Sequence, residues 1–317
     1  MPMKTASLVL LAALAPLAGL SPTAAAGEPE SCSTVRFADV GWTDISVTTA
    51  LASELLEALG YSTRTSTLSV PVAYRSLANG DLDVFLGNWM PTMENDIRRY
   101  REEGSVETLR ANLEGAKYTL AVPAYVYQAG LRDFADIARF RDRLGGKLYG
   151  IEPGNDGNRL IQSMIEQNAF GLGDFKLVES SEAAMLAQVR RAQRSRDWVV
   201  FLGWEPHPMN TQLDMRYLSG GDAFFGPDYG RATVYTNVRK GYTRDCPNVG
   251  RLLGNLVFNL DMENQLMDQV LNARRKPREA ARAWLRANPQ ALDAWLAGVS
   301  GRDGRPGVER VKARMAD

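Results

Sequence analysis

Three tryptophans in this chain follow short apolar segments that end in glycine. Trp42 directly follows a glycine, and Trp89 and Trp204 each lie between a glycine and a proline, in the stretches 86–91 and 202–206. The apolar segments are typical of buried strands, so each indole is expected in the loop after a strand. Because ligands of open α/β sheets bind at the carboxyl ends of the strands, the three indoles predict one pocket with aromatic walls.

A single tryptophan more often fills a hydrophobic core than contacts a ligand. Core packing is the role expected for Trp198, Trp284 and Trp295, which lie beside a predicted strand or in helical patterns. The shared position of the other three tryptophans favours a binding role for them.

Aromatic rings that face one cavity are suited to a cation that cannot be solvated by hydrogen bonds. Indole and phenol rings present negative faces, and each desolvated contact with a cation contributes up to about 2 kcal/mol. Three or four such contacts supply most of the roughly 8 kcal/mol that micromolar binding requires. The ligand implied is a quaternary ammonium compound.

The chain alternates between predicted strands and helices, which indicates an α/β fold with a mainly parallel sheet. An extended run is expected at 118–124, and the glycine-rich tail from Gly298 is expected to be mobile. The predicted strands are 35–39, 63–68, 83–86, 148–151, 175–178, 199–202 and 232–237, and the predicted helices are 45–59, 71–79, 91–103, 155–170, 181–194, 249–256, 261–271, 277–287 and 289–297.

Two similar sets of β/α units predict two lobes with a ligand cleft between them. Lobe 1 is expected to comprise residues 27–117 and 224–317, and lobe 2 residues 118–223. The chain would then cross between the lobes near Tyr118 and near Phe224, and these two crossings are expected to form a hinge.

The N-terminus has the pattern of a signal peptide. Lys4 supplies a positive charge, residues 6–20 form an apolar run, and Ala24-Ala25-Ala26 offers a small-residue cleavage site. Residues 1–26 are therefore expected to be removed on export, which leaves a soluble protein. The 37 basic and 37 acidic residues balance, which argues against a nucleic-acid partner.

The chain has two cysteines, Cys32 and Cys246. An exported protein meets an oxidising compartment, so a disulfide between them is expected. Such a bond would hold the mature N-terminus beside the chain near Cys246. The alternative is a pair of free buried thiols.

Five motifs resemble those of the periplasmic substrate-binding proteins of quaternary-amine ABC importers, most closely the choline-binding members. The resemblance covers residues 32–297, and the motifs recur in order. They are Gly41-Trp42-Thr43-Asp44, Leu86-Gly87-Asn88-Trp89-Met90-Pro91, Lys117-Tyr118, Gly154-Asn155-Asp156-Gly157 and Gly203-Trp204-Glu205-Pro206-His207-Pro208.

This resemblance implies a type II periplasmic-binding-protein fold, in which a hinge connects two lobes and the ligand lies in the interlobe cleft. It implies a periplasmic protein, expected to be a monomer, that passes its ligand to a membrane permease. No catalytic residue, metal or cofactor is expected. The implied aromatic box consists of Trp42, Trp89, Tyr118 and Trp204, the polar contacts are Asp44 and Asn155, and the implied disulfide joins Cys32 to Cys246.

Asp44 lies two residues after Trp42 and can share its loop. A carboxylate there complements a cation and can accept a hydrogen bond from a ligand hydroxyl group, and choline has both features. Glycine betaine carries a carboxylate of its own, which Asp44 would repel. Choline is therefore preferred, with acetylcholine as a weaker ligand. The alternative for Asp44 is an acid that stabilises a helix N-terminus.

The remaining candidates have weaker signals. Asn155 follows a glycine at the start of a predicted helix, so its side chain either caps that helix or reaches into the cleft. Tyr118 is supported by the resemblance and by its place at a lobe crossing. His207 is the only histidine, and with no serine or cysteine nucleophile nearby in the sequence it does not make a triad. It is expected to be structural or to support the loop of Trp204.

Two rival functions stay open. Within the same class, the ligand could be glycine betaine, proline betaine or carnitine. From another class, an exported hydrolase of choline esters would use His207 with the acids Asp44, Asp156 and Glu205. A receptor sensor domain is disfavoured because no later membrane span is apparent in the sequence.

Overall fold

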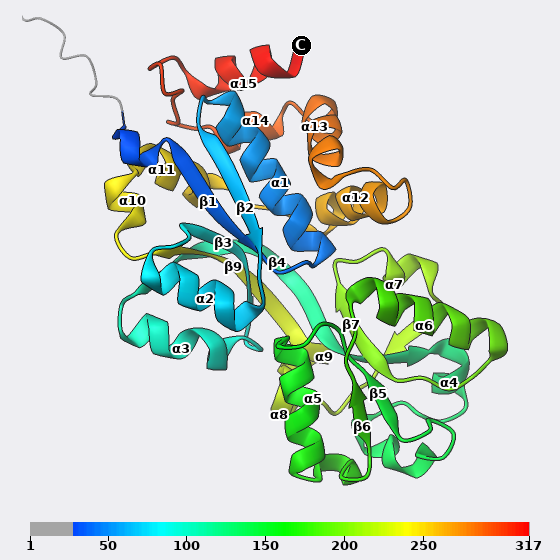
Figure 1. Cartoon of the computed structure of the whole chain (residues 1–317). Coiled ribbons are helices and arrows are strands. Elements are labelled where there is room, and N and C mark those ends of the chain that lie inside the picture. Colours follow the sequence, from blue (N-terminus) through cyan, green and yellow to red (C-terminus); the bar gives the residue numbers. More distant parts are fainter. Residues whose placement is uncertain (1–27, 317) are drawn as a thin grey trace, which may run out of the picture.

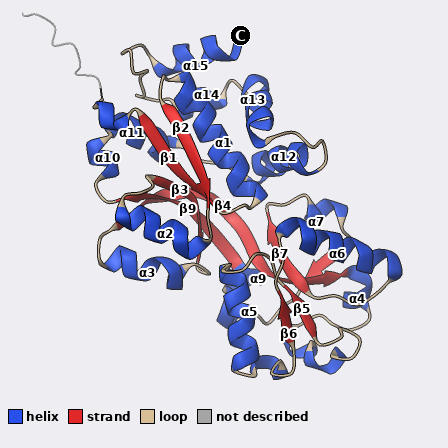
Figure 2. Cartoon of the chain, viewed as in Figure 1, coloured by secondary structure: helices blue, strands red, loops and turns tan. Residues whose placement is uncertain are grey.

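The computed structural model describes residues 28–316, so the expected signal peptide of residues 1–26 lies outside the described residues. Two α/β lobes are connected by the long strands β4 (Val106–Pro123) and β9 (Arg231–Arg239) (Figure 1). Figure 2 shows strands in the interior of each lobe with helices around them. No helix among the described residues is long and apolar enough to cross a membrane.

Lobe 1 begins with three strand and helix pairs, as the sequence predicts. The first strand pairs in parallel with the second and the third, and its side chains, with those of the first helix, supply much of the buried core. The elements are η1 (Glu30–Cys32), β1 (Thr34–Asp39), α1 (Thr43–Ala58), β2 (Ser62–Thr67), α2 (Val70–Asn79), β3 (Val84–Met90) and α3 (Glu94–Glu102).

Lobe 2 repeats this layout with shorter strands, and its central strand again pairs in parallel with two neighbours. Its elements are α4 (Ala124–Gln128), η2 (Phe134–Asp136), η3 (Ala138–Phe140), β5 (Lys147–Tyr149), α5 (Asp156–Glu166), η4 (Ala169–Gly171), β6 (Lys176–Val178), α6 (Glu182–Ser195), β7 (Phe201–Glu205), α7 (Met209–Gln212) and β8 (Met215–Tyr217). The short helices α8 (Asp222–Phe225) and α9 (Pro227–Gly230) lie between β8 and the crossing strand β9.

The strands of residues 28–316 form one sheet of nine strands, in the order β2-β1-β3-β9-β4-β7-β5-β6 with β8 paired to β4. The crossing strands β4 and β9 are antiparallel to each other, and they pair antiparallel with β7 and β3. The sheet is therefore mixed, and the prediction of a mainly parallel sheet is wrong. The reason is that the two crossing strands add antiparallel ladders, with β9 paired to β3 of lobe 1 and β4 paired to β7 and β8 of lobe 2. The lobe boundaries inferred from the sequence stay predictions.

Trp89 and Trp204 lie within β3 and β7 and not in loops after them, which corrects the first expectation. Their strands continue because antiparallel partners extend the ladders, with Trp89 opposite Val234 and Trp204 opposite Tyr118. The glycine at position 87 does not turn the chain. A Cβ atom there would lie 2.8 Å from the side chain of Ile45, so this glycine permits close packing of β3 on α1.

The C-terminal segment is helical and packs on lobe 1, where α1 contacts α12, α13 and α15 (Figure 1). The disulfide between Cys32 and Cys246 is confirmed, with Cα atoms 5.7 Å apart, and it ties the start of lobe 1 to this segment. These helices are α10 (Tyr242–Asp245), α11 (Pro247–Asn255), α12 (Leu260–Leu271), α13 (Pro277–Ala287), α14 (Ala291–Trp295) and α15 (Gly307–Ala316).

The tail from Gly298, expected to be mobile, instead forms part of lobe 1. Its helix α15 buries Val311 completely, and Arg310 donates a hydrogen bond to the carbonyl of Ala58 at the end of α1. The sequence prediction failed because the glycines before α15 suggested a mobile tail, whereas α15 is a short amphipathic helix with a buried apolar position.

Candidate functional site

A cavity of about 260 Å³ lies between the lobes. The lining side chains come from both lobes and from the crossing strand β4. They are Trp42, Asp44, Trp89, Tyr118, Ile151, Asn155 and Trp204, so the structure brings together all six of the candidates and adds Ile151.

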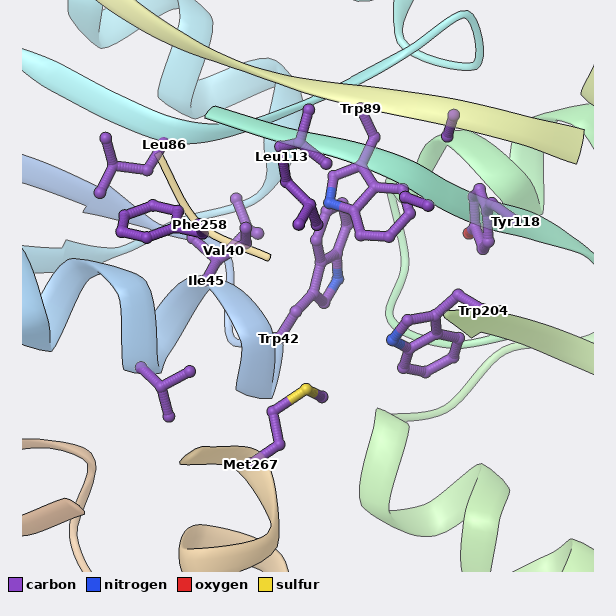
Figure 3. Close-up of a cluster of buried hydrophobic side chains, with 14 of the residues drawn as sticks. Val40, Trp42, Ile45, Leu86, Trp89, Leu113, Tyr118, Trp204, Phe258 and Met267 are labelled. Carbon is purple, nitrogen blue, oxygen red and sulfur yellow. The ribbon is translucent and has the colours of Figure 1, made fainter. Parts of the chain in front are cut away.

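Four aromatic side chains form the walls of this cavity and turn toward one another (Figure 3). The ring centroids of Trp89 and Tyr118 are 6.1 Å apart at an interplanar angle of 62°, and those of Tyr118 and Trp204 are 6.4 Å apart at 82°. Steeply inclined rings enclose a space, whereas parallel rings would stack and fill it. The arrangement presents several ring faces to one point, as an aromatic cage requires.

Two residues that line the cavity, Trp204 and Asn155, fix the position of Tyr118. Its side chain faces Trp204 because the two residues are directly opposite in the antiparallel pair β4 and β7. Its hydroxyl group donates a hydrogen bond of 2.8 Å to Oδ1 of Asn155. Gly157 makes room for this hydroxyl group, because a Cβ atom at position 157 would lie 2.2 Å from it.

Asn155 combines the two roles that the sequence left open. It is the N-cap of α5, where Oδ1 accepts a hydrogen bond from the backbone N–H of Asn158 at 3.0 Å. The same residue lines the cavity. Its amide nitrogen donates to Oδ1 of Asp156 at 3.2 Å. Capping therefore fixes the orientation of a side chain at the cavity wall.

Trp42 is the N-cap residue of α1, and it makes a contact across the cleft. Its indole Nε1 donates a hydrogen bond of 2.6 Å to Oε1 of Glu152, which follows the cavity residue Ile151 in lobe 2. Burial raises the pKa of Glu152 to about 7, although the hydrogen bond from Trp42 opposes this shift. The orientation of the Trp42 ring thus depends on a residue of the opposite lobe.

Asp44 occupies the first turn of α1 and is 1% exposed. Neither of its carboxyl oxygens has a hydrogen-bond partner among the described residues. Burial, together with the nearby charge of Glu182, raises the pKa of Asp44 to about 8. A helix N-terminus does favour an acid, but that position alone does not explain why the carboxyl group points unpaired into a cavity.

The surroundings of the cavity are acidic. Asp156 and Glu263 are also buried, and burial raises the pKa of both; the charge of Asp44 adds to the shift at Glu263. None of the seven described residues that line the cavity is an arginine, a lysine or a histidine. Such a site attracts a cation and opposes an anion.

His207 is buried beside the cavity but does not line it. Its ring centroid lies 4.9 Å from that of Trp204, and Nδ1 accepts a hydrogen bond of 2.9 Å from the backbone N–H of Met209. Nε2 lies 3.1 Å from Oε1 of Glu182. This geometry agrees with the expected support of Trp204. Among residues 28–316, no group of three or more histidine, cysteine or acidic side chains is arranged to hold a metal ion.

Three residues at or around the cavity were missed by sequence reasoning: Ile151, Glu152 and Glu182. Ile151 ends the strand predicted at 148–151 and Glu152 follows it, and an acid at the carboxyl end of a strand was a signal available in the sequence. Glu182 begins a helix like many surface acids, and only its contacts with the opposite lobe distinguish it.

Residues 33–287 match the family described as the substrate binding domain of ABC-type glycine betaine transport systems. The chain is 60% identical over 150 residues to the uncharacterized protein ORF1 of Chromohalobacter salexigens, which covers 47% of this chain and 95% of that protein.

Two solved structures illustrate the similarity. An ABC-transporter choline binding protein in complex with choline is 62% identical, with a TM-score of 0.90 over 91% of this chain and 100% of that chain. Lactococcal OpuAC in its closed-liganded conformation with glycine betaine is 26% identical, with a TM-score of 0.75 over 83% of this chain and 99% of that chain. The fold is that of the type II periplasmic binding proteins. Since the family match extends over more than half of its length, the chain belongs to the substrate-binding domains of ABC-type glycine betaine transport systems.

Proposed function

We propose that this protein binds choline in the periplasm and delivers it to the membrane permease of an ABC importer. The observation that carries the proposal is the cavity in which aromatic rings meet the buried, unpaired carboxyl group of Asp44. Support also comes from the protein of known structure that is 62% identical, because that protein is in complex with choline.

The trimethylammonium group of choline would lie among Trp42, Trp89, Tyr118 and Trp204. Each ring contributes up to about 2 kcal/mol when the contact is desolvated, and these rings are 4–6% exposed. Four contacts are enough for micromolar affinity, which requires about 8 kcal/mol. Asp44 would accept a hydrogen bond from the hydroxyl group of choline and neutralise its charge.

Asp44 also favours choline over glycine betaine, although the family includes proteins that bind glycine betaine. The carboxylate of glycine betaine would meet Asp44 in a cavity whose seven described lining residues include no cationic side chain. Ionised Asp44 would face a like charge at a buried site, which costs several kcal/mol, and protonated Asp44 would lose its attraction for the trimethylammonium group. Proline betaine and carnitine carry the same carboxylate and are disfavoured for the same reason.

The proposed mechanism is capture by closure. Lobe 1 (27–117 and 224–317) supplies Trp42, and lobe 2 (118–223) supplies Trp204, so a ligand contacts both lobes only when the cleft is closed. A ligand with such contacts shifts the equilibrium toward the closed form. The hinge would lie in the two crossings, near Tyr118 and Phe224. The protein acts as a monomer in this scheme.

Isothermal titration calorimetry of the purified protein with choline and glycine betaine tests the assignment. We expect a choline dissociation constant in the micromolar range or below, and binding of glycine betaine at least about tenfold weaker. Tighter binding of glycine betaine than of choline would overturn the choice of ligand.

The proposed capture makes and breaks no bond. Acetylcholine would bind more weakly than choline and would leave the site unchanged, because both ring nitrogens of His207 already contact protein partners, Glu182 and Met209. Incubation with acetylcholine, followed by proton NMR of the acetyl group, checks this point. Hydrolysis that is lost in His207→Ala would favour an esterase instead.

A further inference from the structure

Glu182, which does not line the cavity, connects the two lobes beside it. This residue begins α6 in lobe 2, and its side chain is 6% exposed. Its Oε2 accepts a hydrogen bond from the backbone N–H of Thr43 at 3.0 Å, and its Oε1 accepts one from the hydroxyl group of Thr43 at 2.7 Å. Thr43 is the first residue of α1 in lobe 1. A lobe 2 carboxylate therefore caps a lobe 1 helix.

His207 holds this carboxylate from the side of lobe 2. Because Nδ1 of His207 accepts the backbone N–H of Met209, the ring hydrogen is assigned to Nε2, which donates to Oε1 of Glu182 at 3.1 Å. Burial alone would raise the pKa of Glu182, but the hydrogen bond from His207 and the two hydrogen bonds from Thr43 hold it below its usual value. The acid is thus kept as a carboxylate.

The position of this contact links it to the ligand site. Thr43 lies between Trp42 and Asp44, two residues that line the cavity, and His207 packs against Trp204, a third. Opening the cleft would separate Glu182 from Thr43 and return both to water. The hydrogen bonds between them therefore belong to the closed form alone.

We propose that Glu182 is a positioning residue that fastens the closed lobes together and so slows the escape of ligand, an inference that rests on the proposed choline binding. Contacts present only in the closed form stabilise it without touching the ligand. When the cleft opens to release choline, these contacts must break first. Their loss should increase the dissociation rate and leave the association rate unchanged.

The test uses Thr43→Val, which removes the hydroxyl hydrogen bond and keeps the charge of Glu182 and the shape of residue 43. Tryptophan fluorescence in a stopped-flow instrument gives the association and dissociation rates of choline and glycine betaine. We expect choline to dissociate about 10-fold faster or more, the effect of one hydrogen bond to a charged group, with an association rate within about twofold of the wild type. Thr43→Ser should restore slow dissociation.

The matched control is Thr63→Val. Thr63 donates a hydrogen bond of 2.6 Å to Glu57, but both residues belong to lobe 1, so this bond does not depend on closure. We expect wild-type rates for this variant. Equal acceleration in Thr63→Val and Thr43→Val, or an unchanged dissociation rate in Thr43→Val, would overturn the proposal.

Failure of the proposed function is distinguishable from failure of this interlobe contact. A wild-type protein that binds glycine betaine and not choline refutes the choline assignment, and the dissociation rates of glycine betaine then test Glu182 in the same way. Choline binding with unaltered dissociation from Thr43→Val refutes only the role of Glu182. Binding of neither ligand overturns both proposals.

Discussion

The hydroxyl group of Tyr118 lies 2.8 Å from Oδ1 of Asn155, and this hydrogen bond joins the crossing strand β4 to the first turn of α5. Oδ1 of Asn155 also caps α5, so the phenol ring of Tyr118 is positioned by β4 through its backbone and by α5 through its hydroxyl group. A wall of the cavity is therefore built into the join between strand and helix. Small changes at this join should alter ligand affinity before they alter the fold.

Gly157→Ala tests this dependence. The new Cβ atom would lie 2.2 Å from the hydroxyl oxygen of Tyr118, so the ring must shift. Overpacking of this kind costs about 1–3 kcal/mol, and we expect the choline dissociation constant to rise about tenfold. Calorimetry measures the change. Gly254→Ala is the control, because a Cβ atom there meets nothing within 4 Å, and unchanged affinity in both variants would contradict the role given to Tyr118.

Trp204→Leu separates the negative ring face from simple apolar burial. Leucine keeps a buried apolar side chain opposite Tyr118 but removes the π system that attracts a cation. We expect choline affinity to fall about 30-fold, which corresponds to the loss of about 2 kcal/mol. Calorimetry with choline gives the result.

Trp284→Leu is the matched control for that substitution. Trp284 stacks on Trp295 at a centroid distance of 5.7 Å in the C-terminal helices, away from the cavity. We expect the control to lower the melting temperature and to leave choline affinity unchanged. Full affinity in Trp204→Leu would show that the indole face is not needed.

Much of the architecture could be predicted from local patterns, because β1 and α1 have clear apolar patterns and β2 is a short run rich in Thr and Ser. The crossing strand β4 was recognised only from residue 118. Its first half contains polar residues such as Glu107, Arg110 and Glu114, and the pairing with β9 makes it a strand. Trp89 likewise lies in a strand because β3 pairs with β9, which is distant in the sequence.

The lining of the cavity could be predicted because its aromatic residues follow recognisable strand segments. The contacts that connect the lobes could not. Glu152 meets the indole of Trp42, and Glu182 meets Thr43, 139 positions away, only because the two lobes fold toward each other. A single sequence contains no local pattern for such pairs.

Removal of the disulfide should lower stability and spare the site. The bond between Cys32 and Cys246 spans 214 residues, and in the chain-entropy model it contributes up to about 5 kcal/mol. We expect the double variant Cys32→Ser/Cys246→Ser to unfold at lower denaturant concentration, with a choline dissociation constant within about twofold of the wild type. A reductant should not affect the variant further. A large loss of affinity would show that this end of lobe 1 controls the cleft.

Choline binding should become tighter as the pH rises toward 8, because of Asp44. The pKa of its carboxyl group is raised to about 8 by burial and by the charge of Glu182, so the group is mostly protonated at pH 7. The cation of choline favours the ionised form, and binding should therefore release a proton. Below the pKa the dissociation constant is expected to fall about tenfold for each unit of pH increase, and above it to level off.

Calorimetry at several pH values, in buffers with different ionisation enthalpies, measures both the affinity and the released protons. Asp44→Asn cannot ionise, so its affinity should be lower and its pH dependence much weaker. An uncharged analogue, 3,3-dimethylbutanol, should bind the wild-type protein with little dependence on pH, because it does not favour the carboxylate. If choline binding to the wild type releases no proton between pH 6 and 8, then Asp44 is already ionised before the ligand arrives, and its buried position does not control its charge.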